Sequence, residues 1–277
     1  MISVPSLPQA LDSGLRKQID TWDETRLHVS DLPVAIGEKC PRQLWLRIRG
    51  AEKKKLTAGK LLMFDHGKRI HERLVELMLL PEDWEIESVE SPVDIKGITG
   101  RYDTRLFNTA KGWELIVDFK TVRGNKFNYL DEAMPAHVLQ VQAYIAGSDA
   151  DGGLVFYVDR EGQNQAKQFF VKREDERVFQ AIEIAKNIAE QKFPPPLLEP
   201  VLKISKNKGP DSVKLCQDWK CDYCEYQDVS CPGALKPYQR KNGIIGHIVK
   251  EKFQPKEGYE KLAEVVESLL DKDRVPF

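Results

Sequence analysis

The chain has 277 residues, of which 41% are hydrophobic and 31% are charged, and its formal net charge is −1. This length is enough for one large domain with its own core, or for a domain with a small appendage. No apolar run reaches the ~18 residues that a membrane helix needs, and the N-terminal stretch lacks the basic start and apolar run of a secretory signal. We therefore expect a soluble protein without a membrane partner, in the reducing cytoplasm or in the host cytoplasm if the chain is viral.

A nearly neutral protein has no overall positive field, so any nucleic-acid binding must rely on local clusters of positive charge. Two stretches, residues 42–60 and 203–214, are rich in Lys and Arg. Their basic residues are Arg42, Arg47, Arg49, Lys53, Lys54, Lys55 and Lys60 in the first, and Lys203, Lys206, Lys208 and Lys214 in the second. Each stretch is equally compatible with a solvated helix face.

The N-terminal part of the chain predicts three helices. Ser30 is a good N-cap for a first helix over residues 30–40. A second helix follows Pro41 and ends near Gly50, and a longer one spans residues 58–80. The residues of this third helix that recur at helical spacing, and so face inward, are Phe64, Gly67, His71, Leu74, Val75 and Met78.

Strand-like segments follow the third helix. Residues 85–95, 98–107 and 113–122 are rich in Val, Ile, Thr and aromatic side chains. Gly97 and the stretch 108–112 supply the turns between them. These signals predict three consecutive strands.

The second half of the chain alternates between the two types of element. A helix is predicted over residues 131–147, two strands over 152–159 and 167–173, and a helix over 174–192 that stops at a run of prolines. A last amphipathic helix is predicted over 258–270. The element order predicts an α/β fold, with a mixed sheet flanked by helices.

Asp118 and Lys120 stand two apart in a predicted strand, so their side chains point to the same face of the sheet. The residues around them are apolar, which is typical of a central strand covered on both faces. A carboxylate and an ammonium there are costly unless they pair or serve chemistry. Asp103, on the preceding strand, could lie beside Asp118, and two adjacent carboxylates favour a divalent cation between them. The alternative is a purely structural ion pair between Asp118 and Lys120.

Polar side chains on the flanking helices extend this candidate site. His71 lies on the inward face of its helix, and Gly67, one turn earlier, would let another backbone approach closely. Gln140 and Tyr144 lie four apart on one helical face, from which they could reach a cleft or a phosphate. Each of the three is also compatible with a structural position, His71 in the core and the other two at its edge.

In chain order these residues read G-x-x-x-H, G-x-x-D, D-x-K and Q-x-x-x-Y. The ordered set resembles the RecB-like branch of the PD-(D/E)xK nucleases over about residues 40–231, with Asp118 where many relatives carry Glu. The matching residues are Gly67, His71, Gly100, Asp103, Asp118, Lys120, Gln140 and Tyr144. The resemblance implies a restriction-endonuclease-like core.

The resemblance also implies a metal site. His71, Asp103 and Asp118 would bind Mg²⁺ or Mn²⁺ together with a backbone carbonyl near Phe119, and an imidazole ligand suits Mn²⁺ better. Hydrolysis of a phosphodiester needs an activated water and neutralised charge, both of which a bound cation supplies.

The same resemblance implies catalytic and positioning roles for the remaining matching residues. Lys120 would orient or activate the attacking water and stabilise the charge that develops on the phosphate. Gln140 and Tyr144 would position the DNA strand.

The chain has five cysteines, and in a reducing compartment these favour metal binding over disulfides. Cys221 and Cys224 form a C-x-x-C pair, and Cys231 follows. The fourth ligand is open from spacing alone. Cys216 would complete a local site typical of structural zinc, whereas Cys40 would bind from before the core.

The arrangement with Cys40 resembles the iron–sulfur nucleases, which include the CRISPR-associated RecB-like exonuclease and the nuclease domains of AddB-type and eukaryotic replication helicase-nucleases. In these, one cysteine precedes the core and three follow it. The resemblance implies a [4Fe–4S] cluster that staples the two ends of the domain in a structural role. Its ligands would be Cys40, Cys221, Cys224 and Cys231. Cys216 would then be a free thiol.

These assignments divide the chain into four parts. We predict an N-terminal helical segment over residues 1–60 that contributes Cys40, a nuclease core over 61–195, a cluster-binding segment over 196–235 and a C-terminal helical tail over 236–277.

In size and layout the chain is similar to the CRISPR-associated exonuclease, which implies a DNA exonuclease acting on single strands or DNA ends from 5′ to 3′ in recombination, repair or spacer acquisition. The chain has no G-x-x-x-x-G-K-[ST] motif and hence no ATPase motor of its own, so a helicase, recombination or CRISPR protein would be a partner. The alternatives are a structure-specific endonuclease of the same fold, and a catalytically idle nucleic-acid-binding subunit with a structural metal site.

Overall fold

The computed structural model describes residues 13–17, 23–160, 166–198, 201–204, 213–216, 218–232, 235–239 and 245–249. The chain forms two compact units. The first, called the core unit here, comprises Met1–Lys39, Arg47–Gly50 and Lys55–Gln191; the second, the cysteine unit, comprises Cys40–Leu46, Ala51–Lys54 and Lys192–Phe277. The helix predicted over residues 258–270 lies outside the described residues. Of the described helices, none combines the length and apolar character needed to cross a membrane.

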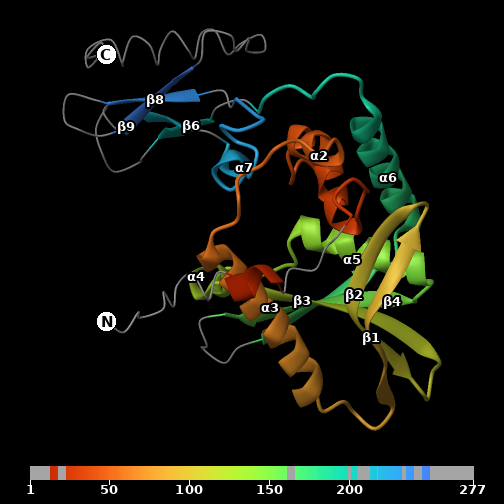
Figure 1. The fold of residues 1–277 in the computed structure, drawn as a ribbon. Coiled ribbons are helices and arrows are strands. Elements are labelled where there is room, and N and C mark those ends of the chain that lie inside the picture. Colours follow the sequence, from red (N-terminus) through yellow and green to blue (C-terminus); the bar gives the residue numbers. More distant parts are fainter. Residues whose placement is uncertain are drawn as a thin grey trace, which may run out of the picture. The chain divides into compact units, whose positions relative to one another are not determined.

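The core unit is built on a five-stranded sheet with the order β1-β2-β3-β4-β5 (Figure 1). Its strands are β1 Trp84–Ile95, β2 Ile98–Asn108, β3 Trp113–Val122, β4 Gly152–Asp159 and β5 Ala166–Lys172. Only β3 and β4 pair in parallel; the other neighbours are antiparallel. The predicted mixed sheet is therefore confirmed, and β3 is its central strand.

The residues of the turn between β1 and β2, and of β3, explain why these segments form neighbouring strands. Ile95 pairs with Ile98, so Lys96 and Gly97 form the two-residue turn between β1 and β2. Both have positive φ, 51° and 80°, which is the backbone of a type I′ hairpin turn. The apolar run of β3 has Ile116, Val117 and other residues buried, as expected of a strand covered on both faces.

The described helices are η1 Val29–Ile36, α2 Pro41–Ile48, α3 Ala58–Leu77, α4 Gly124–Asn128, α5 Pro135–Ser148, α6 Asp175–Glu190 and α7 Trp219–Asp222. The helices predicted after Pro41, over 58–80, over 131–147 and over 174–192 are thus present as α2, α3, α5 and α6. The short α4 and α7 were not predicted, because segments of five and four residues carry no periodicity.

The first predicted helix was wrong in type and in its cap. Val29–Ile36 is a 3-10 helix with Pro33 inside it, and its N-cap is His28 rather than Ser30. The reason is Asp31, whose carboxylate accepts the His28 backbone N–H at 2.8 Å. Arg47 pairs with the same carboxylate, which holds it at the start of the helix.

Helix α3 divides into two halves. Leu74, Val75 and Met78 in its C-terminal half pack against a buried cluster of Leu106, Val117 and Phe119. In the other half Phe64 is 57% exposed. The prediction that the whole stripe faces the core is therefore wrong, because the N-terminal half of the helix lines an open cleft.

The opposite face of β3 is covered by α5. Gly153 of β4 pairs with Ile116, and a Cβ on Gly153 would lie 2.6 Å from Val141 and 3.2 Å from Ile145 of α5. Alternate residues of a strand face opposite sides, so Asp118 and Lys120 share the face of Ile116, and Phe119 faces α3.

The cysteine unit contains two small antiparallel sheets, and the sequence predicted none of their strands. One pairs β6 Val201–Ile204 with β7 Val213–Cys216, and the other pairs β8 Leu235–Gln239 with β9 Ile245–Val249. Strands of four or five residues are too short to show alternation above their background, and Pro237 within β8 argues against a strand.

Candidate active site

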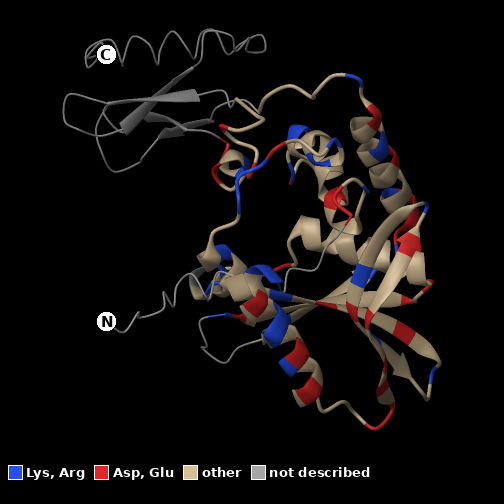
Figure 2. Ribbon diagram, viewed as in Figure 1, with Lys and Arg blue, Asp and Glu red and all other residues tan. Residues whose placement is uncertain are grey.

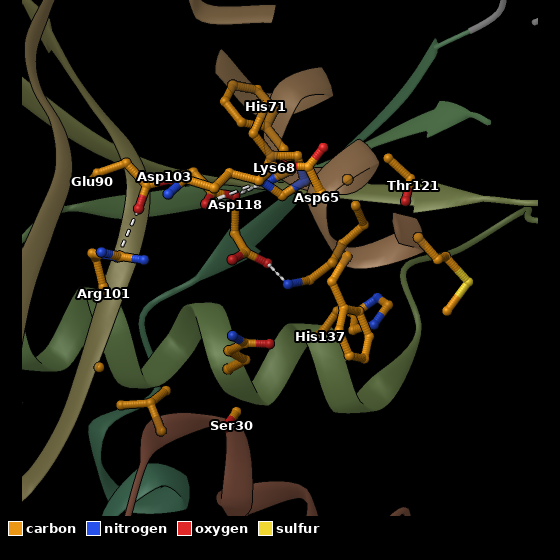
Figure 3. A pocket seen from close by; sticks show the side chains of 18 of the residues that line it. Ser30, Asp65, Lys68, His71, Glu90, Arg101, Asp103, Asp118, Thr121 and His137 are labelled. Atoms are coloured by element: carbon orange, nitrogen blue, oxygen red, sulfur yellow. Dashed lines mark hydrogen bonds and ion pairs between the residues drawn. The ribbon is translucent and has the colours of Figure 1, made fainter. Parts of the chain in front are cut away.

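The site lies where β2 and β3 separate. Their ladder runs from Asn108 opposite Trp113 to Thr104 opposite Val117. Beyond that point β2 continues to pair with β1, and β3 with β4. The first residue beyond the ladder on each strand is an aspartate, Asp103 on β2 and Asp118 on β3. The two carboxylates therefore meet at the point where the strands separate, which is called the fork here (Figure 3).

At the fork one backbone N–H of β3 has no partner on β2, and a carboxylate accepts its hydrogen bond instead. The Phe119 N–H donates to Asp103 Oδ2 at 2.6 Å. Hydrogen bonds to carboxylates are short and strong, so this bond fixes the orientation of the Asp103 side chain at the fork.

Asp118 and Lys120 form a close pair inside the fork. The Lys120 ammonium lies 2.6 Å from Asp118 Oδ2, and the Asp118 side chain is only 4% exposed. Burial raises the pKa of Asp118 to about 6, and the Asp103 charge adds to this rise while Lys120 opposes it. The carboxylate is therefore under-solvated, a condition that a cation would relieve.

His71 reaches the same place from α3. Its Nδ1 lies 3.4 Å from Asp103 Oδ1, and its ring packs beside that of Phe119 with centroids 5.7 Å apart. Glu90 of β1 lies with them. Among the described residues, only His71, Glu90 and Asp103 bring three potential metal ligands within 4.8 Å of one another.

Glu90 and His137 are site residues that the sequence reading missed. Glu90 is one of several acids in an alternating strand, and only the strand register distinguishes it from the others. His137 lines the same cleft, and burial together with the Lys120 charge lowers its pKa to about 3. Its Nδ1 lies 2.8 Å from the Tyr157 hydroxyl. A neutral imidazole at the start of α5 has no signature in the sequence.

Gln140 and Tyr144 lie on one face of α5 and contact each other. The Gln140 amide donates to the Tyr144 hydroxyl at 2.8 Å. Tyr144 is buried, and burial together with the Asp118 charge raises the pKa of its hydroxyl. Gln140 is the more exposed of the two, so it lies between Tyr144 and the open cleft.

The two glycines of the sequence motifs differ in their surroundings. A Cβ on Gly100 would lie 2.7 Å from the Tyr144 ring and 2.8 Å from Val29, so a side chain at this position would displace both. A Cβ on Gly67 would meet nothing within 4 Å. The expected close backbone approach at Gly67 is therefore wrong, and this glycine lines the open cleft instead.

All these side chains line one hollow of about 850 Å³. Basic side chains around it include Lys68, Arg101 and Arg160, and apolar ones include Met63 and Phe64. Acidic and basic residues are interspersed along α3 (Figure 2), and the lining of the cleft likewise includes acidic side chains beside the basic ones. A phosphate chain could follow the basic side chains while bases contact the apolar ones.

Arginines of the first basic stretch make structural contacts, whereas the sequence suggested nucleic-acid binding or a solvated helix face. Arg42 donates to the Pro195 carbonyl at 2.7 Å within the cysteine unit. In the core unit Arg47 donates to the Glu24 carbonyl, and Arg49 donates to the Ala189 carbonyl at 2.8 Å. These guanidinium groups bind the chain's own carbonyls, so they are structural. Lys206 and Lys208 of the second stretch lie outside the described residues.

Four cysteines line a second, small hollow, which lies within the cysteine unit. Cys40 is buried, and all four are free thiols. They are Cys40, Cys221, Cys224 and Cys231. Burial is the main cause that raises the pKa of Cys40, and it raises the pKa of Cys221 to about 12. Thiolates in such a place need a metal to be stable.

The two segments that carry these cysteines are tied together by backbone contacts. The Lys54 N–H donates to the Glu225 carbonyl at 2.8 Å, and the Ser230 hydroxyl donates to the Glu52 carbonyl at 2.6 Å. Cys216 is the last residue of β7, and its side chain lies outside the described part of the chain.

The sequence matches the family model of the PD-(D/E)XK nuclease superfamily over residues 32–232. The match covers the fork, the cleft and the cysteine hollow. The chain therefore belongs to the PD-(D/E)XK nuclease superfamily, whose members use divalent metal ions. No curated protein sequence matches the chain.

Solved structures with a similar fold include SSO0001, with 17% identity, a TM-score of 0.48, and coverage of 82% of this chain and 94% of the other. An alkaline exonuclease from Laribacter hongkongensis has 10% identity and a TM-score of 0.42, covering 65% of this chain and 90% of its own. A phage related exonuclease from Haemophilus somnus 129PT has 14% identity and a TM-score of 0.43, covering 60% and 92%.

Proposed function

We propose that the chain is a metal-dependent DNA exonuclease that hydrolyses single strands or DNA ends. The observation that carries the proposal is the fork of β2 and β3. There Asp103, Asp118 and Lys120 meet in one cleft, and burial raises the pKa of the Asp118 carboxylate. This is the arrangement that metal-assisted phosphodiester hydrolysis needs.

His71, Asp103 and Asp118 would hold Mn²⁺ or Mg²⁺. Their donor set of one imidazole and two carboxylates suits such an ion by its chemistry and, because of the imidazole, favours Mn²⁺. Of the three, His71 and Asp103 belong to the group whose ligand atoms lie within 4.8 Å of one another, and Asp118 lines the same cleft. A bound cation neutralises phosphate charge and lowers the pKa of a water. The Phe119 N–H holds Asp103 in its orientation through the 2.6 Å bond.

Lys120 is the proposed group that orients the attacking water and stabilises the developing charge. Its ammonium is held by Asp118 at 2.6 Å, and therefore it enters the cleft from β3 in a fixed position. A positioned cation in a site of low dielectric stabilises a transition state more than it would in water.

Gln140 is proposed to contact the DNA, and Tyr144 to position it. Tyr144 is buried and accepts the Gln140 amide donor at 2.8 Å, so it acts through Gln140 rather than by direct contact. The amide oxygen of Gln140 is left to face a nucleotide or a water in the cleft.

Two features of the cleft favour a single strand as the substrate. Met63 and Phe64 line it and are 44% and 57% exposed, and exposed apolar side chains suit contact with unstacked bases. Lys68, Arg101 and Arg160 line it as well. Aromatic and basic groups together are typical of surfaces that bind single strands. The resemblance to CRISPR-associated exonucleases supports 5′ to 3′ polarity and a role in recombination, repair or spacer acquisition.

A [4Fe–4S] cluster is proposed for the cysteine hollow. The donors fit, since four thiols line one hollow. Cys40 lines it together with Cys221, Cys224 and Cys231, which supports the cysteine arrangement that resembles the iron–sulfur nucleases.

The test is digestion of end-labelled single- and double-stranded DNA with the 5′ or the 3′ end blocked, with and without Mn²⁺. We expect Mn²⁺-dependent release of short products from single strands, stopped by a 5′ block. Internal cutting of blocked substrates would favour the structure-specific endonuclease. Binding without cleavage under every metal condition would favour the idle nucleic-acid-binding subunit and refute the enzyme.

A further inference from the structure

An irregularity in β1 turns one acidic residue toward the active site. The pairing of β1 with β2 shifts by one residue between Ile86 and Ser88. Before the shift Ile86 is opposite Leu106; after it, Val89 is opposite Thr104. Because side chains alternate, a shift of one residue exchanges the two faces of everything that follows. β-Bulges are used in this way beside active sites.

The residue that this shift affects is Glu90. It stands between the pairs Val89–Thr104 and Ser91–Tyr102, and hence directly across from Asp103. Directly opposed residues share one face of a sheet. Glu90 also has a positive φ of 50°, which marks a further local distortion of the strand at this position.

The result is a carboxylate beside two proposed metal ligands. Potential ligand atoms of His71, Glu90 and Asp103 lie within 4.8 Å of one another, and they come from α3, β1 and β2. Figure 3 shows the Glu90 and Asp103 side chains next to each other.

We infer that Glu90 is a ligand of the active-site cation, together with His71 and Asp103. The inference rests on the proposed function, because it concerns the same metal. Two carboxylates directly opposed on neighbouring strands repel each other, and the local distortion of β1 maintains that contact. A divalent cation between them removes the repulsion.

The rival explanation is that Glu90 serves only to bind Arg101. The Arg101 guanidinium lies 2.7 Å from the Glu90 carboxylate. The two explanations predict opposite effects of removing Arg101. If Glu90 is only its ion-pair partner, the loss of either residue has the same consequence. If Glu90 is a ligand, the loss of Arg101 removes a competitor for its carboxylate.

The experiment measures Mn²⁺ binding to the full chain by titration calorimetry without DNA. Thiolate sites prefer softer metals than Mn²⁺, so the cysteine hollow contributes little. We expect Glu90→Gln to weaken the Mn²⁺ Kd by about 10-fold or more, on the scale of changes at metal sites. Glu90→Asp keeps a carboxylate and should lose less Mn²⁺ affinity than Glu90→Gln. The matched control is Glu87→Gln, on the same strand as Glu90, where the Glu87 carboxylate pairs with Arg105 of β2 at 2.8 Å. The Mn²⁺ Kd of this variant should not change.

The Arg101→Gln variant decides between the two explanations. We expect its Mn²⁺ Kd to equal or improve on that of the unmodified protein. Equal weakening in Arg101→Gln and Glu90→Gln would overturn the inference, as would an unchanged Kd in Glu90→Gln. If Asp103→Asn still abolishes binding in that case, only the role of Glu90 fails. If Asp103→Asn also leaves binding unchanged, the proposed metal-dependent function fails as well.

Discussion

The Asp118 carboxylate and the Lys120 ammonium occupy a position where neither would be stable alone. Moving an ion into a protein interior costs several kcal/mol, and a partner recovers only part of that cost. Two apolar side chains of similar size would stabilise β3 better. Conversion of the pair to apolar residues should therefore not unfold the protein, whereas the chemistry proposed for it should be lost.

Lys120→Ala is the sharpest single test of the catalytic assignment. We expect kcat for single-stranded DNA to fall at least ~100-fold, the scale of removing one group that stabilises a transition state by its charge, while DNA affinity changes little. Asp118→Ala should show a similar loss. Steady-state digestion with saturating Mn²⁺, combined with anisotropy for binding, measures both quantities.

Lys111→Ala provides the control for Lys120→Ala. This lysine precedes β3, and its ammonium lies 4.7 Å from the centroid of the Trp113 ring, away from the fork. The nuclease activity of the Lys111→Ala variant should be unchanged. Near-normal turnover in Lys120→Ala would mean that the Asp118–Lys120 pair is structural, which is the alternative that the sequence left open.

Residue spacing predicted some of the site and not the rest, for physical reasons. The two-residue period of a strand is enough to place Asp118 and Lys120 on one face. Nothing in the sequence shows where a ladder ends or shifts. The fork that joins Asp103 to Asp118, and the shift that brings Glu90 to them, both depend on pairing between strands and become visible only in the folded sheet.

Helix α3 shows how one amphipathic element serves two purposes. Its C-terminal half packs against the sheet through Leu74, Val75 and Met78, and its N-terminal half lines the cleft. A periodic apolar stripe indicates which face of a helix is covered, but it does not distinguish a protein core from a ligand. The exposed end of the stripe is the part we assign to DNA.

Phe64→Ala tests that assignment at the scale of the helix. If an unpaired base stacks on Phe64, the loss of this ring should weaken single-stranded DNA binding by about 5- to 150-fold, which corresponds to about 1–3 kcal/mol per stacked base. Double-stranded DNA should be affected less. Anisotropy with labelled oligonucleotides, in a buffer without divalent metal, measures binding free of cleavage.

Leu62→Ala is the matched control, because Leu62 is 48% exposed on the same helix but does not line the cleft. It should bind DNA normally. Equal losses in the two variants would indicate a change in the helix itself, and no loss in either would remove Phe64 from the DNA path.

The contact between β2 and α5 depends on a glycine. A side chain at Gly100 would collide with the ring of Tyr144 and with Val29. We expect Gly100→Ala to cost about 1–3 kcal/mol of unfolding free energy, as overpacked sites do, and to disturb Gln140 through Tyr144. Thermal or urea unfolding measures the change.

Gly67→Ala is the comparison for Gly100→Ala. An added methyl group meets nothing there, and alanine is favoured over glycine in a helix by about 1 kcal/mol. This variant should be at least as stable as the unmodified protein. A larger loss of stability at Gly67 than at Gly100 would contradict the packing described for both positions.

At the scale of the whole chain, long periodic segments were predictable and short ones were not. The bounds of β3 and β4 agree with the sequence because their apolar runs are bordered by glycines and turns. The strands β6 to β9 have four or five residues each, and such strands are stable only through neighbours that the sequence does not reveal. The superfamily was predictable because its residues recur in a fixed order, although each short motif is weak.

The cysteine unit joins segments that are far apart in the chain. Cys40 lies before the strands of the core unit, and the other three thiols of the hollow follow them. A group bound by all four would close a very long loop, which lowers the entropy of the unfolded chain. We therefore expect protein purified without oxygen to be brown and to absorb in the visible range, as iron–sulfur centres do and zinc sites do not. Cys40→Ser should bleach it and lower its melting temperature.

Cys216→Ser is the control that separates the two metal arrangements, because only the local zinc site would use Cys216 as its fourth ligand. It should keep both colour and stability. One zinc and no iron by metal analysis, with Cys216→Ser as the damaging change, would instead establish a local zinc site. The nuclease assignment is independent of that result, since Asp103, Asp118 and Lys120 lie in the core unit and share no ligand with the cysteines. Loss of DNA cleavage in Cys40→Ser should therefore follow its loss of stability, and cleavage should recover at temperatures where the variant is folded.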